Sequence, residues 1–318
     1  MFQTPVLLIT FNRPNHTRQV FEAIKKQKPT KLFVFQDGAR EGNERDIENC
    51  KAVRAIFEEP LEWDCDLKTF YSEFNLGCGR GPSTGITWFF ENVEQGIIFE
   101  DDCLPHPDFF EYCEILLKKY RDNSDISFIS GTNFQDGIKR GIGSYYFSLG
   151  HHGTWGWATW KRTWQLFDYY LSNMTSNEVD KILRKNFKNY KQFEYFREIY
   201  KGVLDNRYNE SCWDYQFYMT CWKNNMISVI PNVNLITNIG FDNLGTHTTG
   251  DHLFANNHVY NILPIKFVDK IERDENADLY LHKHYVQSSE YGWAGFKRLP
   301  HRINKRLKKL VGKKGSWL

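Results

Sequence analysis

The sequence predicts an α/β fold built on a mostly parallel sheet with helices on its flanks. Apolar, β-branched runs alternate with segments of helical periodicity through the first 120 residues. Polar or acidic residues follow several of these runs directly, at Asn12, Asp37 and Glu100. This alternation is typical of doubly wound sheets, in which ligands bind beyond the carboxyl ends of the strands.

The elements are expected in a regular order from the N-terminus. Strands are predicted at residues 5–11, 32–35, 67–71 and 97–102, and helices at 17–26, 46–58, 86–93 and 109–120. Beyond about residue 145 the pattern changes to an aromatic-rich stretch, a polar helical insert near 176–205 and a strand at 226–230. Because there is no internal repeat and no long linker, we expect one mixed domain over 1–250 and a C-terminal extension over 251–318.

Composition narrows the class of protein. The seven cysteines are scattered and include no C-x-x-C pair, which disfavours a disulfide framework and a structural zinc site. The first residues show neither a basic segment nor a long apolar run, so we expect a cytoplasmic protein with no transmembrane segment.

The charge is segregated at the C-terminus. The net charge is +2, yet the last 22 residues hold nine Lys or Arg and no acid. With apolar residues at helical intervals, this tail is either an amphipathic helix that lies on an anionic membrane at the inner face or a solvated terminus. We do not expect the body to bind nucleic acid.

The acidic triplet Glu100, Asp101 and Asp102 is the most specific signal for chemistry. Adjacent carboxylates at a strand end repel one another unless a cation or solvent relieves them. Carboxylate oxygens suit Mn²⁺ or Mg²⁺, and these ions take one or two protein carboxylates together with phosphate oxygens. The alternative is that Asp101 and Asp102 cap the next helix or face solvent.

Several motifs occur together in one order, and their sum resembles a known group of enzymes. They are PVLLITFNRPNHTRQVFEAI, FVFQDG, FNLGCGRG, GIIFEDDCLPHPDFFEYCEILLKKY, ISGTNF, WGWATWKRTW and SCWDYQFYMT. This set resembles N-acetylglucosaminyltransferase I and related glycosyltransferases of the GT-A type. It is similar also to a bacterial group of nucleotide-diphospho-sugar transferases, some of which carry hemolysin-like labels. The resemblance runs from about residue 5 to 250 and implies a Rossmann-like GT-A fold and a nucleotide-sugar donor, with UDP favoured.

The resemblance also implies roles for individual residues. Asp102 becomes the direct metal ligand, Asp101 lies near the ribose, and Glu100 lies near the transferred sugar. Arg13 faces the nucleotide, and Asp37 accepts a hydrogen bond from a uracil-like base. From the residues alone, Arg13 is as well explained as a surface cation, and Asp37 as a turn residue beside Gly38.

The stretch NLGCGRG adds Asn75, Gly77 and Arg80 as secondary donor-site candidates. Its glycines permit close approach of a nucleotide to the backbone just before a helix. It matches neither G-x-G-x-x-G nor a P-loop, which disfavours a dinucleotide or ATP site. A plain tight turn is the alternative.

The segment SCWDYQFYMT places Trp213 and Asp214 at the start of a predicted helix. In the resemblance, Trp213 belongs to the donor site and Asp214 is the base that removes a proton from the acceptor hydroxyl, which favours inversion at the sugar carbon. Asp214 is otherwise an ordinary acid in a first helical turn.

Aromatic residues and a late histidine complete the candidates. Trp155 and Trp157 are expected on the acceptor side, because aromatic faces bind the apolar faces of sugars, although core packing accounts for them equally well. His247 matches a late histidine that touches the metal or diphosphate in some GT-A proteins, with an exposed loop residue as the alternative.

These observations predict a metal-dependent, inverting glycosyltransferase that moves a sugar from a nucleotide diphosphate to a hydroxyl of a glycan, glycolipid or protein. A second class is a carbohydrate-binding or membrane-associated protein on the same fold without turnover. A third class is a nucleotidyltransferase that makes a nucleotide sugar, but the sequence lacks an early glycine-rich, basic phosphate loop.

Overall fold

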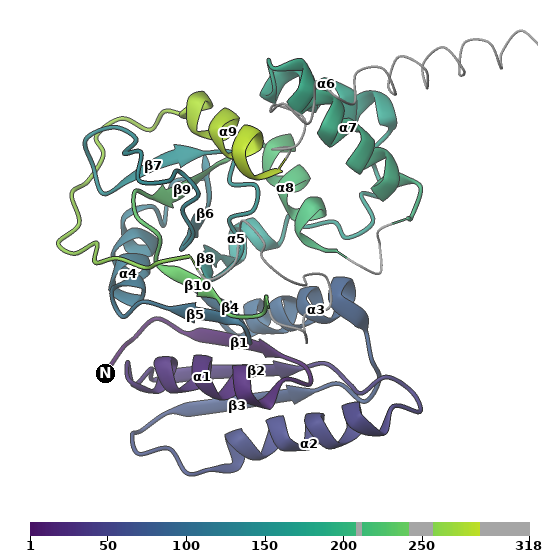
Figure 1. Ribbon diagram of the computed structural model, residues 1–318, viewed down its shortest axis with the longest axis vertical. Helices are drawn as coiled ribbons and strands as arrows, with labels where there is room; N and C mark the ends of the chain where they lie inside the picture. Colours follow the sequence, from purple (N-terminus) through teal and green to yellow (C-terminus); the bar gives the residue numbers. More distant parts are fainter. Residues whose placement is uncertain (208–211, 242–256, 287–318) are drawn as a thin grey trace, which may run out of the picture.

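A large mixed sheet organises the molecule (Figure 1). The computed structural model describes residues 1–207, 212–241 and 257–286, and this part of the chain forms an eight-stranded sheet in the order β3-β2-β1-β4-β8-β6-β9-β7. Six strands share one direction, whereas β7 and β8 run antiparallel to their neighbours, so the predicted mostly parallel α/β sheet is confirmed. The strands are β1 (Val6–Thr10), β2 (Lys31–Gln36), β3 (Asp66–Tyr71), β4 (Gln95–Glu100), β6 (Ile126–Ser130), β7 (Tyr145–Ser148), β8 (Trp157–Trp160) and β9 (Ile227–Pro231).

Helices cover both faces of the sheet. In β1, Val6 and Leu8 pack into a core shared with α1, α2 and α4, whereas Leu7 and Ile9 pack into a second core with α3 and α5 to α8. A strand that is buried on both faces consists of consecutive apolar residues, and for this reason β1 could be predicted from the sequence. The helices are α1 (Pro14–Lys25), α2 (Glu44–Glu58), α3 (Gly77–Asn92), α4 (Asp108–Lys119), α5 (Lys161–Trp164), α6 (Ser176–Asn186), α7 (Tyr190–Leu204), α8 (Asp214–Lys223) and α9 (Glu275–Leu281), with a π-helix at His282–Val286.

Helix α3 begins at Gly77, well before the predicted start at residue 86. The stretch predicted as a glycine-rich loop is therefore the first part of a helix. Glycine and proline are poor helix formers, so the helix propensity of this stretch did not predict a helix here. Two tertiary contacts outweigh propensity: a Cβ on Gly81 would lie 3.2 Å from Asp37 Oδ2, and one on Gly85 would lie 2.6 Å from Phe35 Cγ. The glycines let α3 pack closely on β2.

The tryptophan-rich stretch forms a strand where the sequence indicated a loop or a first helical turn. Strand β8 (Trp157–Trp160) inserts antiparallel between β4 and β6, and all four of its residues are buried. The predicted helical insert is confirmed as α6 and α7, and the predicted strand at 226–230 is confirmed as β9.

The described part of the expected C-terminal extension packs on the sheet. Arg273 forms a β-bridge with Phe147 of β7, and its guanidinium is paired with the buried Asp278 of α9. Asp278 also accepts a hydrogen bond from Ser148 at 2.7 Å. The basic tail, expected to be either a membrane-bound amphipathic helix or a solvated terminus, falls outside the described residues. Among the helices that are described, none is both long and apolar enough to cross a bilayer.

Candidate functional site

The candidate site lies at the carboxyl ends of β1, β2 and β4. The chain proceeds from β1 to β2 and β3 on one side and then places β4 on the other side of β1, so the strand order reverses between β1 and β4. Ligands of open α/β sheets bind at such a reversal. A cleft of about 1290 Å³ opens here. Nine of the predicted site residues line it, namely Arg13, Asp37, Asn75, Gly77, Arg80, Glu100, Asp101, Asp102 and Trp155.

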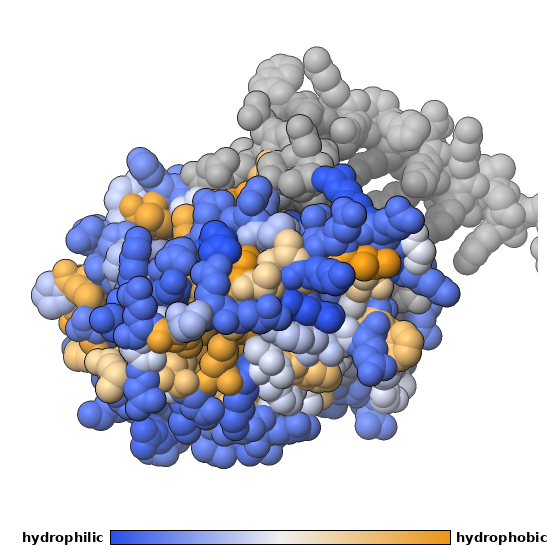
Figure 2. Space-filling view, turned by 90° about the horizontal axis from the view of Figure 1, so that it is seen from below, coloured by the Kyte–Doolittle hydropathy of each residue, from blue (hydrophilic) through white to orange (hydrophobic). Residues whose placement is uncertain are grey.

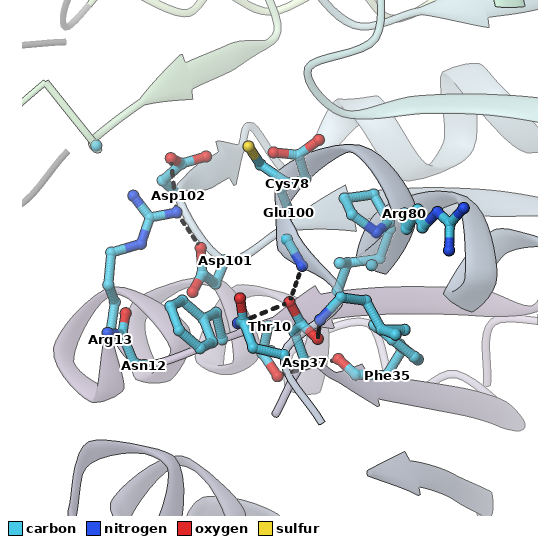
Figure 3. A pocket seen from close by; sticks show the side chains of 18 of the residues that line it. Thr10, Asn12, Arg13, Phe35, Asp37, Cys78, Arg80, Glu100, Asp101 and Asp102 are labelled. Carbon is cyan, nitrogen blue, oxygen red and sulfur yellow. Dashed lines mark hydrogen bonds and ion pairs between the residues drawn. The ribbon is translucent and has the colours of Figure 1, made fainter. Parts of the chain in front are cut away.

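The acidic turn after β4 faces Arg13 across the cleft floor (Figure 3). Glu100 ends β4, and Asp101 and Asp102 form the turn that follows. The Arg13 guanidinium lies 2.9 Å from Asp102 Oδ2 and contacts Asp101 Oδ1 more closely still. Burial alone would lower the pKa of Arg13, but the charges and hydrogen bonds of the two aspartates raise it. The ends of β1 and β4 therefore meet through an ion pair that was not predicted from the sequence.

One guanidinium does not balance three carboxyl groups. Asp101 is 3% exposed, and its Oδ2 is buried with no hydrogen-bond partner among the described residues. Burial, followed by the charges of Asp102 and Asp101, raises the pKa of Glu100 to about 8. The turn thus holds negative potential and a bare carboxylate oxygen, which is the donor chemistry that suits a hard divalent cation. No group of three or more His, Cys, Asp or Glu side chains arranged for a metal occurs in the described ranges.

A second small sheet holds the acidic turn in place. Strand β5 (Cys103–Pro105) pairs antiparallel with β10 (Ile236–Asn238), and the Ile239 amide donates to the Asp102 carbonyl at 2.9 Å. The next residue, Gly240, lies against the charged pair: a Cβ there would be 2.3 Å from Asp102 Oδ2 and 3.0 Å from Arg13 Nη1. The sequence pattern carried no signal for Gly240, because the contact joins residues far apart in the chain.

Replacing Gly240 with alanine is expected to disturb the acidic turn. The added methyl group must displace either the Asp102 carboxylate or the Arg13 guanidinium, and overpacking of this kind costs about 1–3 kcal/mol. Chemical denaturation measures the loss. The Asp102→Ala background is the control, because removing the carboxylate relieves the clash and the cost of Gly240→Ala should fall there. Equal costs in both backgrounds would refute the steric account.

Asp37 caps a helix in this structure. Its Oδ1 accepts the backbone N–H groups of Gly38 at 2.9 Å and Leu76 at 2.8 Å, and its Oδ2 accepts those of Gly77 at 3.0 Å and the Asn75 amide at 3.1 Å. A carboxylate offers about four acceptor positions, so all are in use. The role of Asp37 as an acceptor for a base stays a prediction, and in this structure a base would have to displace one of these donors. Burial raises the pKa of Asp37.

The remaining residues of the glycine-rich stretch are also engaged within the protein. Asn75 donates a second hydrogen bond to the Gly38 carbonyl at 2.8 Å, and the Gly77 amide is held by Asp37. Arg80 donates to the Tyr170 hydroxyl across the cleft and lies over its ring. The stretch predicted as a loop before a helix is thus the capped start of α3, and Arg80 and Tyr170 both line the cleft beside it.

Two of the predicted tryptophans belong to the core. Trp157 is 1% exposed and stacks on Trp213 with ring centroids 5.7 Å apart, and neither residue lines the cleft. The acceptor-side role of Trp157 and the donor-site role of Trp213 are therefore wrong for this structure, because their faces are covered by other aromatic rings. Trp155 lines the cleft and packs edge-on against Phe134 and Phe241.

Asp214 begins α8 behind the acidic turn. It is not among the residues that line the cleft, but its charge contributes to the raised pKa of Glu100, which puts the two carboxyl groups within electrostatic reach. Burial raises the pKa of Asp214 to about 6. His247 lies outside the described residues.

The cleft also contains residues that were not predicted as site residues. Asn12 lines it beside Arg13 and is fixed by a hydrogen bond of 2.7 Å to Asp46 of α2. Tyr170 and Asn206 come from the region of the helical insert, and Asn238 and Phe241 come from the segment around β10. Asn12 was detectable as a polar residue at a strand end; the others carry no local pattern.

Comparison with known proteins leaves the chain without an assigned family. No family model matches it, and no curated protein matches it. Solved structures give distant likenesses. The 4-diphosphocytidyl-2C-methyl-D-erythritol synthase of Anaerococcus prevotii DSM 20548 is 9% identical, with 62% of this chain and 85% of that chain covered and a TM-score of 0.33. The inositol-1-phosphate CTP transferase of T. maritima is 9% identical, covering 52% and 74%, with a TM-score of 0.32.

A UDP-glucose pyrophosphorylase complexed with UDP-glucose is 12% identical, with 71% of this chain and 89% of that chain covered and a TM-score of 0.35. At such distances the function has to come from the residues of the site itself. The resemblance to N-acetylglucosaminyltransferase I stays a prediction. What the described residues establish is an α/β protein with an acidic cleft at the strand-order reversal of its sheet.

Proposed function

We propose that this protein is a glycosyltransferase that uses a nucleotide-diphosphate sugar, with UDP favoured, and transfers the sugar to a hydroxyl of a glycan, glycolipid or protein. The observation that carries the proposal is the acidic turn Glu100–Asp101–Asp102, which meets Arg13 inside a cleft at the strand-order reversal. Carboxylates alone would repel a diphosphate, so a cation between them and the phosphates supplies the attraction.

The size of the cleft supports a large polar donor. Typical small-molecule sites occupy about 300–1,000 Å³. A volume of about 1290 Å³ leaves space for a nucleotide sugar and for part of an acceptor. Its wall carries both charged groups, such as Arg13 and Arg80, and the aromatic Trp155, which offers a surface for a sugar ring.

A divalent cation, Mn²⁺ or Mg²⁺, fits the residues of the turn. The carboxylates of Asp102 and Asp101 would hold it, and phosphate oxygens of the donor and water would supply its other ligands. When bound, the ion neutralises the charge that develops on the departing diphosphate. Arg13 keeps both aspartates oriented and adds positive charge on the same side.

Asp214 is the proposed base. With a pKa of about 6, it is mostly ionised at neutral pH and yet basic enough to accept a proton from a hydroxyl as that hydroxyl attacks. One such carboxylate, placed opposite the departing diphosphate, favours inversion at the sugar carbon. His247 is proposed as an additional contact to the metal or diphosphate.

Nucleotidyl transfer is the competing reaction. The short loop between β1 and α1 argues against it. Only Phe11, Asn12 and Arg13 join β1 to α1, and the cation among them is already bound by two carboxylates. A triphosphate carries more negative charge than a diphosphate sugar and would need further positive groups at this position.

Thermal unfolding with a panel of nucleotides and nucleotide sugars tests the proposal, in the presence of Mn²⁺, Mg²⁺ or EDTA. Ligand at a hundredfold excess over Kd stabilises the native state by about 2.7 kcal/mol, which raises the Tm by about 5 °C. We expect this rise with one nucleotide-diphosphate family and its loss in EDTA. Release of pyrophosphate from a nucleoside triphosphate and a sugar 1-phosphate would instead establish nucleotidyl transfer. A flat response to every donor would contradict both.

A further inference from the structure

Two surface loops lie side by side at the edge of the molecule beyond β7 (Figure 1). The first covers residues 137–143 and the second covers 264–272. The Ser144 amide donates to the Lys266 carbonyl at 2.7 Å, and the Lys266 amide donates to Ser144 Oγ at 2.8 Å. A Cβ on Gly143 would lie 2.5 Å from Val268 Cγ2. The close approach at this glycine holds the two loops together as one surface, here named the loop patch.

The loop patch exposes large apolar side chains. Ile142 is 80% exposed and Phe267 is 47% exposed, and Ile138 and Ile271 are exposed as well. In the second loop the neighbouring Ile265 and Val268 pack against the core instead. Single exposed apolar residues are ordinary, but these four lie on two loops that are hydrogen-bonded to each other. On the face shown in Figure 2, hydrophobic residues form separate patches in a mainly hydrophilic surface.

Lysines alternate with these apolar side chains. Lys139 lies between Ile138 and Ile142 in the sequence, and Lys266 and Lys270 flank Phe267. The Lys119 ammonium of α4 lies 4.6 Å from the centre of the Phe267 ring. The acids of the two loops are Asp269 and Glu272, and Glu272 is paired with Lys270 at 2.6 Å. With Arg140 included, the two loops hold four basic and two acidic residues, so the loop patch is cationic overall.

We propose that the loop patch docks on an anionic lipid bilayer. Exposed isoleucine and phenylalanine side chains on loops can enter the boundary of the acyl chains, while lysine stems extend along apolar surface and place their ammonium groups among lipid phosphates. Each lysine near an anionic membrane adds to the attraction. Because the apolar residues are separated by cations and do not form one continuous apolar face, a bilayer fits them better than a protein surface does. The loop patch shares no residue with the basic C-terminal tail, and the proposal does not rest on the proposed sugar transfer.

Sedimentation of the full chain with vesicles tests this docking. The vesicles contain phosphatidylcholine with or without phosphatidylglycerol. The test variant combines Ile142→Ser, Phe267→Ser and Lys266→Glu, all at exposed positions, so its Tm should match the unmodified protein. We expect binding to the anionic vesicles and a fall of at least about tenfold in the partition coefficient of the variant. The matched control is Ile47→Ser with Lys51→Glu on α2, also exposed, which should bind normally.

The basic tail is present in every sample, so the comparison isolates the loop patch. Equal partition of the test variant and the unmodified protein would overturn the proposal and assign binding to another part of the chain. So would absence of binding to anionic vesicles, or an equal loss in the α2 control. None of these results depends on whether the protein transfers sugar, because no donor or acceptor is added.

Discussion

The Asp102→Asn variant is expected to lose on the order of 10³-fold in kcat/KM for sugar transfer, the upper range for removing one preorganised group that stabilises developing charge. Asparagine keeps the shape of aspartate and can still accept the hydrogen bond from Arg13 through its carbonyl oxygen. The change therefore removes charge from the acidic turn with little change in packing. The metal-dependent rise in Tm with the nucleotide-sugar donor should disappear in the same variant.

Steady-state kinetics at several Mn²⁺ concentrations measure the effect. Glu94→Gln is the matched control, because the Glu94 side chain is 84% exposed and pairs only with Lys161 among the described residues. It should behave as the unmodified protein does. If Asp102→Asn kept its donor-dependent stabilisation and its turnover, the acidic turn would not be the cation site, and the proposed function would lose the observation that carries it.

The Asp214→Asn variant is expected to lose turnover while it keeps donor binding, whereas Asp102→Asn should lose both. Loss of a general base typically costs 10²- to 10⁴-fold, and here the loss should fall on kcat. Donor binding, read as the metal-dependent rise in Tm, should remain, because Asp214 does not line the cleft beside the acidic turn. A parallel loss of donor binding would identify Asp214 as part of the donor site and not as the base.

The pH dependence separates a catalytic Asp214 from a structural one. Its pKa is raised to about 6, so activity of the unmodified protein should rise as the pH increases through about 6 and level off above it. The sign for stability is the reverse: a folded pKa above the unfolded value means that the folded state favours the protonated form, and stability declines as the pH rises from about 4 to 6. Asp214→Asn removes this penalty, so its Tm at neutral pH should be unchanged or higher. Low activity combined with a lower Tm would indicate a structural role.

Part of the candidate site could be predicted from local pattern. Strands β1 and β4 are buried on both faces, so they appear in the sequence as apolar runs, and the residues directly after them, Arg13 and Asp101–Asp102, had to lie at one edge of a parallel sheet. Their contact in the structure follows from that geometry. The three acids at the end of β4 indicated a functional site, because three adjacent acids are seldom needed there for structural reasons.

The errors have a common origin in contacts between distant parts of the chain. Trp157 and Trp213 were predicted to lie in the binding site, the first because aromatic rings stack on sugars and the second from the family resemblance. In the structure β8 inserts between β4 and β6, so Trp157 lies in the core and stacks on Trp213. Asp37 had the position of a ligand-binding residue, but the start of α3 folds over it and uses its acceptors. No local periodicity distinguishes a tryptophan that stacks on sugar from one that stacks on tryptophan.

The sequence by itself determined the buried strands and the acidic residues that end β4, because apolar periodicity and a charge at a strand end are local properties. Tertiary structure alone decided where α3 begins, that Gly240 lies against Asp102, and that the loops at 137–143 and 264–272 form one surface. In each of these cases the decisive contact is made with a residue far away in the chain. That contact is either a hydrogen bond or a close approach that only a glycine permits. Such pairings depend on which surfaces meet after the sheet has formed, and neither propensity nor spacing encodes them.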